Sequence, residues 1–178
     1  MKGVIFSAVQ SAIERNFGDA TWDQIIDDAG LSGAYTSLGN YDDAELVAII
    51  TGAPDDTGEG LAERLRWFGK ESVPFLVEAF PEFFEGKLLL DFLPSLNHII
   101  HPEVRKLYPG STPPDFDLFD EGTDSLTLRY TSERQLCFLA EGFTFGVAAH
   151  TGETVEISQP VCMHEGGDHC ELRIDVRR

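Results

Sequence analysis

Hydrophobic residues in the first part of the chain recur at steps of three and four positions, the spacing that lines one face of a helix. Residues 4–17 follow this pattern up to Gly18, which predicts a first helix that ends there. Thr21 is a favourable cap for a short second helix, and the pair Asp42–Asp43 can open a third. Between residues 61 and 108 the same spacing continues, but prolines interrupt it, and each should end or kink a helix.

After residue 108 the pattern changes from helical spacing to alternation. The string Pro-Gly-Ser-Thr-Pro-Pro at 109–114 cannot be helical, and residues 115–120 and 125–130 alternate around a polar turn, which predicts a hairpin. A helix should run from about Ser132 to His150 and end at Gly152. A second hairpin follows, with strands around 155–161 and 170–176. The predicted fold is therefore α+β, with an N-terminal helical part and an antiparallel sheet of about four strands with a helix packed across it.

Composition narrows the class of protein. The 178 residues predict a single domain, and 13 Lys and Arg against 31 Asp and Glu give a net charge of −18, which repels a phosphate backbone. No apolar run approaches the ~20 residues that span a bilayer. Three cysteines are an odd number and too few for a disulfide scaffold. We expect a cytoplasmic protein that binds neither nucleic acid nor a membrane.

A first motif with chemical potential is the string Tyr-x-Ser-x-Arg, formed by Tyr130, Ser132 and Arg134 where a strand should give way to a helix. The Tyr130 hydroxyl, the Arg134 guanidinium and the N–H groups of a first helical turn can converge on one anion, a carboxylate above all. An ordinary cap, with Arg134 paired to a surface carboxylate, explains the same residues.

A second motif is a pair of histidines, His98 and His101, three residues apart on an apolar helix. A neutral imidazole with apolar neighbours can bind haem iron, although a lone histidine is more often structural. Pro102 follows His101 directly and disfavours helical geometry there, so His98 is a rival ligand.

The two motifs occur in an order that resembles one known family. Val104 and Arg105 follow His101, then come Tyr108-Pro109, Pro113-Pro114, a hairpin and the Tyr-x-Ser-x-Arg string. This order looks like the H-NOX (haem nitric oxide/oxygen binding) family of stand-alone bacterial type, related to the haem domain of soluble guanylate cyclase. The resemblance spans the chain and includes its Met-Lys-Gly opening and the string Phe-Pro-Glu-Phe-Phe at 80–84.

The resemblance implies a b-type haem, iron protoporphyrin IX, bound between two parts of the chain. Residues 1–60 would form mainly the distal helical part, and residues 61–178 the proximal part with the haem helix and the sheet. His101 would be the proximal iron ligand and Pro114 would press on the haem and distort it, although a proline that only starts a strand suits the fold equally. The haem propionates would bind Tyr130, Ser132 and Arg134.

The resemblance also implies a preference among gases. Family members that hold O2 have a tyrosine where this chain has Leu139, and we expect Ile5, Val9 and Leu76 to line the same distal pocket. Such a pocket is apolar and offers no hydrogen-bond donor. We therefore expect ferrous haem to bind NO and CO and to exclude O2.

By the same resemblance the chain is a sensor that signals in trans and is not itself an enzyme. NO should weaken or break the bond between iron and His101, which lets the haem relax against Pro114 and the helical part shift. The implied partner is a histidine kinase or a cyclic-di-GMP enzyme, that is, a diguanylate cyclase or phosphodiesterase.

The three cysteines form the last candidate site. Cys162 and Cys170 flank a glycine turn, and Cys137 lies on the helix expected to cover this sheet, an arrangement that suits tetrahedral zinc. In family members with such a site the fourth ligand is a histidine three residues before the first hairpin cysteine, where this chain has Gln159. His164 is then preferred over His169 as the fourth ligand. The alternative to zinc is three unmetallated thiols that can form a disulfide or be oxidised, which would make the region a redox switch. The alternative function is a zinc-structured, thiol-based redox adaptor that regulates a signalling enzyme without haem chemistry.

Overall fold

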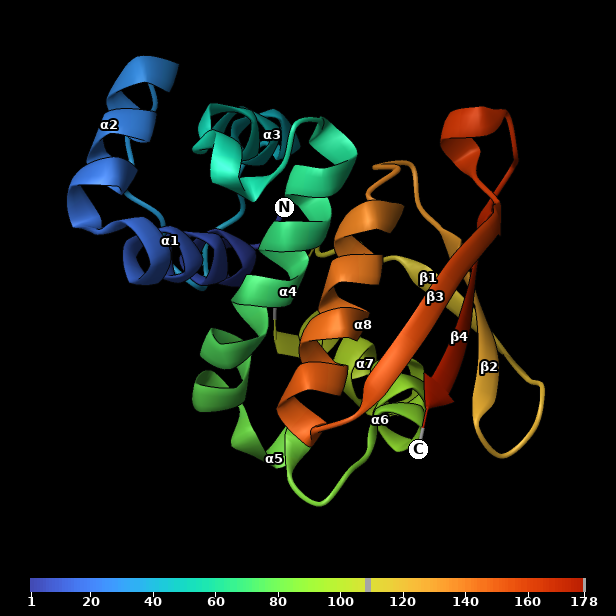
Figure 1. Ribbon diagram of the computed structural model, residues 1–178. Coiled ribbons are helices and arrows are strands. Elements are labelled where there is room, and N and C mark those ends of the chain that lie inside the picture. Colours follow the sequence, from blue (N-terminus) through green and yellow to red (C-terminus); the bar gives the residue numbers. More distant parts are fainter. Residues whose placement is uncertain (108–109, 178) are drawn as a thin grey trace.

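The computed structural model describes residues 1–107 and 110–177. Tyr108 and Pro109, which belong to the predicted motif after His101, lie outside the described residues. Helices precede and cover a four-stranded antiparallel sheet, so the predicted α+β fold is confirmed (Figure 1). Among residues 1–107 and 110–177, no helix combines the length and the hydrophobicity needed to cross a membrane.

Three helices and a short 3-10 turn make up the N-terminal part. They are α1 (Gly3–Phe17), α2 (Asp19–Ala29), α3 (Asp43–Gly52) and η1 (Asp55–Thr57). Gly18 ends α1 with a φ of 87°, a left-handed value that favours glycine. The prediction that Thr21 caps α2 is wrong, because the helix begins at Asp19 and the Thr21 hydroxyl donates to the Phe17 carbonyl at 2.9 Å.

Asp42 caps α3 as predicted, since its carboxylate accepts the Ala44 N–H at 2.9 Å. The next helix, α4 (Leu61–Ala79), contains Pro74 and continues past it. Pro74 is exposed and does not end the helix. Pro81 does mark a boundary, because it is the first residue of the short helix α5 (Pro81–Phe84).

The segment that carries His101 is continuous but not uniformly α-helical. It consists of α6 (Leu89–Ser95), a π-helical turn η2 (Leu96–Ile100) and α7 (His101–Leu107). The His101 N–H donates to the carbonyl of Leu96, five residues back, and His101 itself is helical with φ −64° and ψ −39°. The expected break before Pro102 is therefore absent, because the wider π turn relieves the clash that a proline ring makes with an α-helical carbonyl.

The sheet has the order β1-β2-β4-β3 and is antiparallel throughout. The first hairpin pairs β1 (Asp115–Asp120) with β2 (Ser125–Thr131), and Leu118 lies opposite Leu128. The second pairs β3 (Thr154–Val161) with β4 (Cys170–Arg177) through the short turn η3 (Met163–Glu165). Both predicted hairpins are confirmed.

The last helix, α8 (Cys137–Thr151), begins five residues later than predicted. Ser132 accepts the Arg134 N–H within a turn instead of capping the helix, and Gln135 has a left-handed φ of 52°. The Tyr130 hydroxyl accepts the Leu136 N–H at 3.0 Å. These side-chain acceptors offer the backbone an alternative to the first helical turn. Gly152 ends α8 in the left-handed region, as predicted.

Two hydrophobic clusters build the core. The first, the N-terminal cluster, lies among α1, α2, α3 and the first half of α4. The second lies between the sheet, α6 and α8. Helices α4 and α8 lie side by side and contribute to both clusters (Figure 1). Their close approach depends on three glycines that face the backbone or side chains of the neighbouring helix: Gly69, Gly142 and Gly146.

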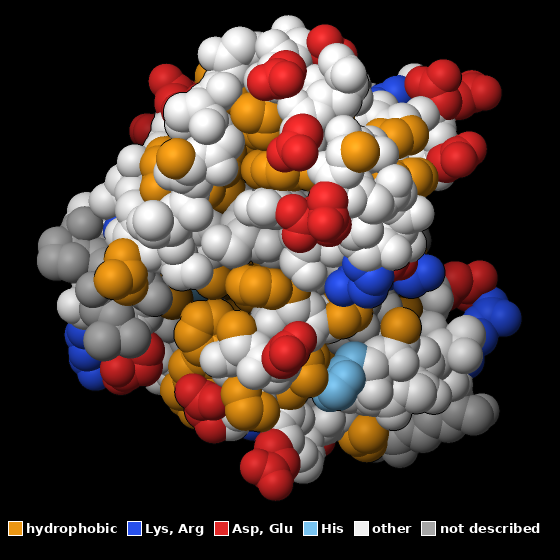
Figure 2. All heavy atoms as spheres, turned by 90° about the vertical axis from the view of Figure 1, so that its left-hand side faces the viewer, with side chains coloured by type: hydrophobic (Ala, Val, Ile, Leu, Met, Phe, Trp, Pro, Cys, Tyr) orange, Lys and Arg blue, Asp and Glu red, His pale blue; other side chains and the backbone are white. Residues whose placement is uncertain are grey.

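The surface charge is uneven along the chain. Residues 19–63, which include α2, α3 and η1, contain eleven Asp and Glu and no Lys, Arg or His. Figure 2 shows the face that carries α1 and α2, where acidic side chains outnumber basic ones and hydrophobic side chains are exposed between them. Most of the net charge of −18 is therefore concentrated in this segment.

Candidate functional site

His101 is a half-buried imidazole at the junction of η2 and α7. Its ring lies against the ring of Phe116 on β1, with 5.4 Å between the centroids. The Nδ1 atom is buried and has no hydrogen-bond partner among the described residues. The pKa of His101 is lowered to about 4, because burial disfavours the charged ring and Arg105 adds a smaller repulsion. At neutral pH the imidazole is therefore uncharged and has a free lone pair.

His98, the rival ligand, is exposed on η2. An iron ligand in an apolar pocket needs burial and a fixed ring, which His98 lacks. The structure thus favours His101.

Tyr130 and Ser132 lie at the end of β2, beside the turn that leads to α8. The Tyr130 side chain is 3% exposed, and burial raises its pKa, so its hydroxyl keeps its proton. Both hydroxyl oxygens accept backbone N–H groups, from Leu136 and Arg134 respectively. The Ser132 hydroxyl also hydrogen-bonds to Tyr130, which leaves the Tyr130 O–H group as a donor that can point to an anion.

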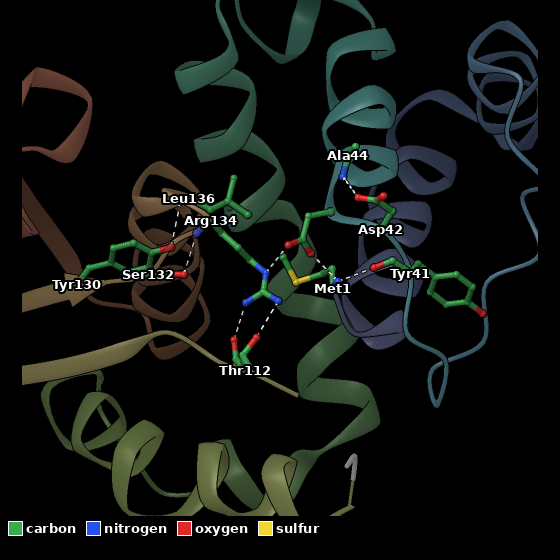
Figure 3. A network of polar contacts seen from close by, with 10 residues as sticks. Met1, Tyr41, Asp42, Ala44, Thr112, Tyr130, Ser132, Arg134 and Leu136 are labelled. Atoms are coloured by element: carbon green, nitrogen blue, oxygen red, sulfur yellow. Dashed lines mark hydrogen bonds and ion pairs between the residues drawn. The ribbon is translucent and has the colours of Figure 1, made fainter. Parts of the chain in front are cut away.

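Arg134 lies at the centre of a polar network that joins three parts of the chain (Figure 3). Its Nε donates to Asp43 at the start of α3 at 2.7 Å, and its Nη atoms donate to the carbonyl and hydroxyl of Thr112 at 2.5 and 2.9 Å. The Met1 amino group contacts the other oxygen of Asp43 at 2.5 Å. The Arg134 guanidinium therefore already binds one carboxylate, that of Asp43, through its Nε atom.

Asp43 and Thr112 are functional candidates that sequence reasoning missed. From the sequence alone, Asp43 is only a residue at the start of a helix, where its charge favours the helix dipole. Its partner Arg134 is 91 residues away, and no local pattern identifies such a pair.

We expect Asp43→Asn to lower the free energy of unfolding at pH 7 by about 1 kcal/mol, because it removes two ion pairs that are partly exposed. Burial raises the pKa of Asp43, but the positive charges of the Met1 amino group and Arg134 lower it by more than burial raises it. The net shift of the pKa is therefore downward. The carboxylate thus stabilises the fold above the pKa of an unfolded Asp, about 3.9, and this stabilisation is lost as pH falls below that value.

Urea unfolding of both proteins at pH 7 and at pH 3 checks this expectation. Asp55→Asn is the matched control, since Asp55 pairs with Arg64 but is fully exposed. Its effect at pH 7 should be smaller than that of Asp43→Asn. A stability difference for Asp43→Asn that persists unchanged at pH 3 would contradict the assignment.

The predicted distal residues divide between the two hydrophobic clusters. Val9 on α1 and Leu139 on α8 are 0% and 5% exposed in the N-terminal cluster, and Ile5 packs against it. Leu76 on α4 packs against the other cluster. Pro114 is half-buried directly before β1. The structure thus brings Ile5, Val9 and Leu139 together and places Leu76 farther along α4.

The three cysteines meet in one buried group. Their Sγ atoms all lie within 4.8 Å of one another, and burial raises the pKa of Cys137 to about 12. His164, the preferred fourth zinc ligand, is not part of this group, because it is exposed and its Nε2 lies 2.8 Å from the Gln135 carbonyl. His169 contacts Asp168 and Glu171 instead.

The side chains present fit a haem but do not fit a closed zinc site. A buried neutral imidazole with an unpartnered nitrogen, a guanidinium and two hydroxyls fit the iron and the carboxylates of haem. Three cysteines without a histidine do not fit a closed four-ligand zinc site.

Comparison with known proteins agrees with the haem interpretation. The chain matches the family described as Haem-NO-binding over residues 2–159. It is similar to an H-NOX protein from S. oneidensis in the Fe(II)NO state, with 28% identity, a TM-score of 0.91 and full coverage of both chains. The Fe(II)CO structure of an H-NOX domain from Shewanella oneidensis has 28% identity and a TM-score of 0.87, with coverage of 100% and 99%. The unliganded Fe(II) H-NOX protein from K. algicida has 26% identity and a TM-score of 0.83, with coverage of 100% and 97%. The family match covers most of the sequence, and the chain therefore belongs to the Haem-NO-binding family.

Proposed function

We propose that this chain is a haem-based nitric oxide sensor that binds a b-type haem through His101. The observation that carries the proposal is the buried, unpartnered Nδ1 of a neutral imidazole. A neutral imidazole keeps one nitrogen lone pair, and such a ring with apolar neighbours can bind haem iron. The family match names haem as the group that supplies the iron.

The residues around His101 have separate tasks in this proposal. His101 holds the iron from α7, and Phe116 fixes the plane of its ring. Arg134 binds a propionate and gives up part of its contact with Asp43 or Thr112, while Tyr130 and Ser132 donate their hydroxyls. Pro114 limits the position of the macrocycle. When bound, the haem supplies a ferrous iron that takes up a diatomic gas.

The apolar surroundings of Leu139 favour NO and CO over O2. Leu139 is buried in the same cluster as Val9, and the two tyrosines packed against that cluster, Tyr35 and Tyr41, donate their hydroxyls to Glu45 and to the Ala34 carbonyl. O2 bound to ferrous haem depends more on a hydrogen-bond donor than NO or CO does. We therefore assign to this protein a preference for NO and CO with exclusion of O2.

Leu139→Tyr should increase O2 affinity, because it adds a hydroxyl donor to an apolar cluster. A hydrogen bond contributes about 1–3 kcal/mol, so the affinity should rise roughly 5- to 150-fold. Absorption spectra of the reduced protein under graded O2 measure the change. Leu139→Phe is the matched control, since it adds the ring without the hydroxyl and should not raise the affinity. Equal behaviour of the two variants would contradict the assignment of Leu139 to the gas pocket.

For signalling, we propose that His101 is released from iron when NO binds. Release frees α7 and the η2 turn from a fixed point, and the N-terminal helices can then shift relative to the sheet. The signal passes in trans to a histidine kinase or to a diguanylate cyclase or phosphodiesterase. The acidic N-terminal helices would suit a basic surface on that partner.

The direct test is the absorption spectrum of the purified protein with haem, reduced and then exposed to NO, CO or air. The proposal expects haem to be retained, distinct NO and CO spectra, and no stable complex in air. A protein that takes up no haem when hemin is offered would refute the sensor function. Co-purification of candidate kinases with and without NO tests the partner separately.

A further inference from the structure

The three cysteines come from separate elements that end at one place. Cys137 is the first residue of α8, Cys162 follows β3, and Cys170 begins β4. All three side chains are buried, at 0%, 6% and 0% exposure, and their Sγ atoms lie within 4.8 Å of one another. Buried thiols at this spacing need only a small contraction to bind one metal ion.

No histidine completes the group. The ring of His164 stacks on Phe138 at 5.1 Å, and its Nε2 is engaged by the Gln135 carbonyl. Among the described residues, the metal-ligating side chains at this spacing are the three cysteines alone. The polar side chain beside them is that of Gln159, whose Nε2 donates to Cys137 Sγ at 3.3 Å.

The backbone supports this position of Gln159. The pairing of β3 with β4 is irregular between Ser158 and Val161, and such a bulge redirects a side chain. The Met163 N–H donates to Cys170 Sγ at 3.2 Å, so two of the three sulfurs receive an N–H donor. Hydrogen bonds of this kind stabilise a metal-bound thiolate.

We propose that this group is an open three-thiolate site for a thiophilic divalent cation, which Gln159 supports as a hydrogen-bond donor and does not close as a ligand. Binding replaces three S–H protons by one divalent ion and leaves a net charge of −1, with three protons released to solvent. Structural zinc is almost always held by four protein ligands. Thiolates favour softer ions, so the site should prefer Cd2+ to Zn2+, and the lack of a fourth protein ligand should show as ready loss of Zn2+.

The experiment compares Cd2+ and Zn2+ titrations of the full-length apo protein, using sulfur-to-cadmium absorption and competition with a chromophoric chelator. One Cd2+ should bind per chain, and Zn2+ should be lost readily to the chelator. Gln159→His places an imidazole beside the sulfurs and should raise Zn2+ affinity by more than the roughly 10- to 100-fold that a supporting group contributes, with a smaller gain for Cd2+. Gln159→Leu, which has similar size and no ligand atom, is the control and should gain nothing.

His164→Ala distinguishes this site from one that His164 closes by rearrangement, and it should leave both affinities unchanged. The proposal is overturned if wild-type protein retains Zn2+ as firmly as Gln159→His, if His164→Ala weakens binding, or if Cd2+ produces no thiolate absorption. None of these measurements involves haem, so their outcome neither supports nor contradicts the proposed sensor function.

Discussion

Replacing His101 with glycine should remove the iron ligand and abolish stable haem binding, and added imidazole should restore it. Loss of a group that merely supports a metal ligand costs about 10- to 100-fold in metal affinity, so loss of the ligand itself should cost more. The glycine leaves space beside Phe116 in which free imidazole can replace the side chain. Haem content and the iron–histidine vibration of the reduced protein measure the loss and the recovery.

His98→Gly is the matched control, because it makes the same change three residues earlier on an exposed position. It should retain haem and an unaltered spectrum. Circular dichroism of both apo proteins checks that α6 to α7 remains helical. The assignment of His101 fails if His101→Gly keeps the wild-type spectrum, or if His98→Gly is the variant that loses haem.

Local patterns predicted most of the fold, because most elements here are specified by nearby residues. Alternation located both hairpins, and spacing of three and four located the helices. Errors occurred where a contact distant in sequence, or a side chain bound to backbone, overrode the local signal. Tyr130 and Ser132 delayed the start of α8 by accepting N–H groups, and the η2 turn allowed a helix to pass through Pro102.

The candidate site was predicted only in part, for a related reason. His101 and the Tyr-x-Ser-x-Arg residues were found because each motif is contiguous in sequence. Asp43 was missed because it meets Arg134 only after folding. His164 is the fourth zinc ligand that the sequence analysis prefers, yet in the folded chain its ring stacks on Phe138.

The pairing of α4 with α8 connects the two hydrophobic clusters. Leu139 lies in the N-terminal cluster and Cys137 in the other, two residues apart on α8. Arg66 on α4 donates to the buried carboxylate of Glu141 at 2.8 Å across the same contact. A change in the distance between α4 and α8 should therefore alter both halves of the molecule.

Gly142→Ala should destabilise the protein strongly, because the added Cβ would overlap the carbonyl oxygen of Arg66 on α4. Overpacking costs about 1–3 kcal/mol. A backbone carbonyl cannot change rotamer to make room as a side chain can, so we expect the free energy of unfolding to fall by about 3 kcal/mol. For a domain of this size that corresponds to a fall in melting temperature of about 6–12 °C. Thermal and urea unfolding of the apo protein measure it.

Gly52→Ala at the end of α3 is the control that isolates the clash. A Cβ there meets only the Ile25 side chain, at 3.4 Å, which is ordinary van der Waals contact. Because alanine favours a helix over glycine, this variant should be neutral or more stable by about 0.4–1 kcal/mol. If Gly142→Ala were as stable as Gly52→Ala, α4 and α8 could separate without cost, and their contact could not couple the two clusters. A large loss confined to Gly142→Ala would instead show that α4 and α8 cannot move apart without cost, which is the rigidity that coupling between the two clusters requires.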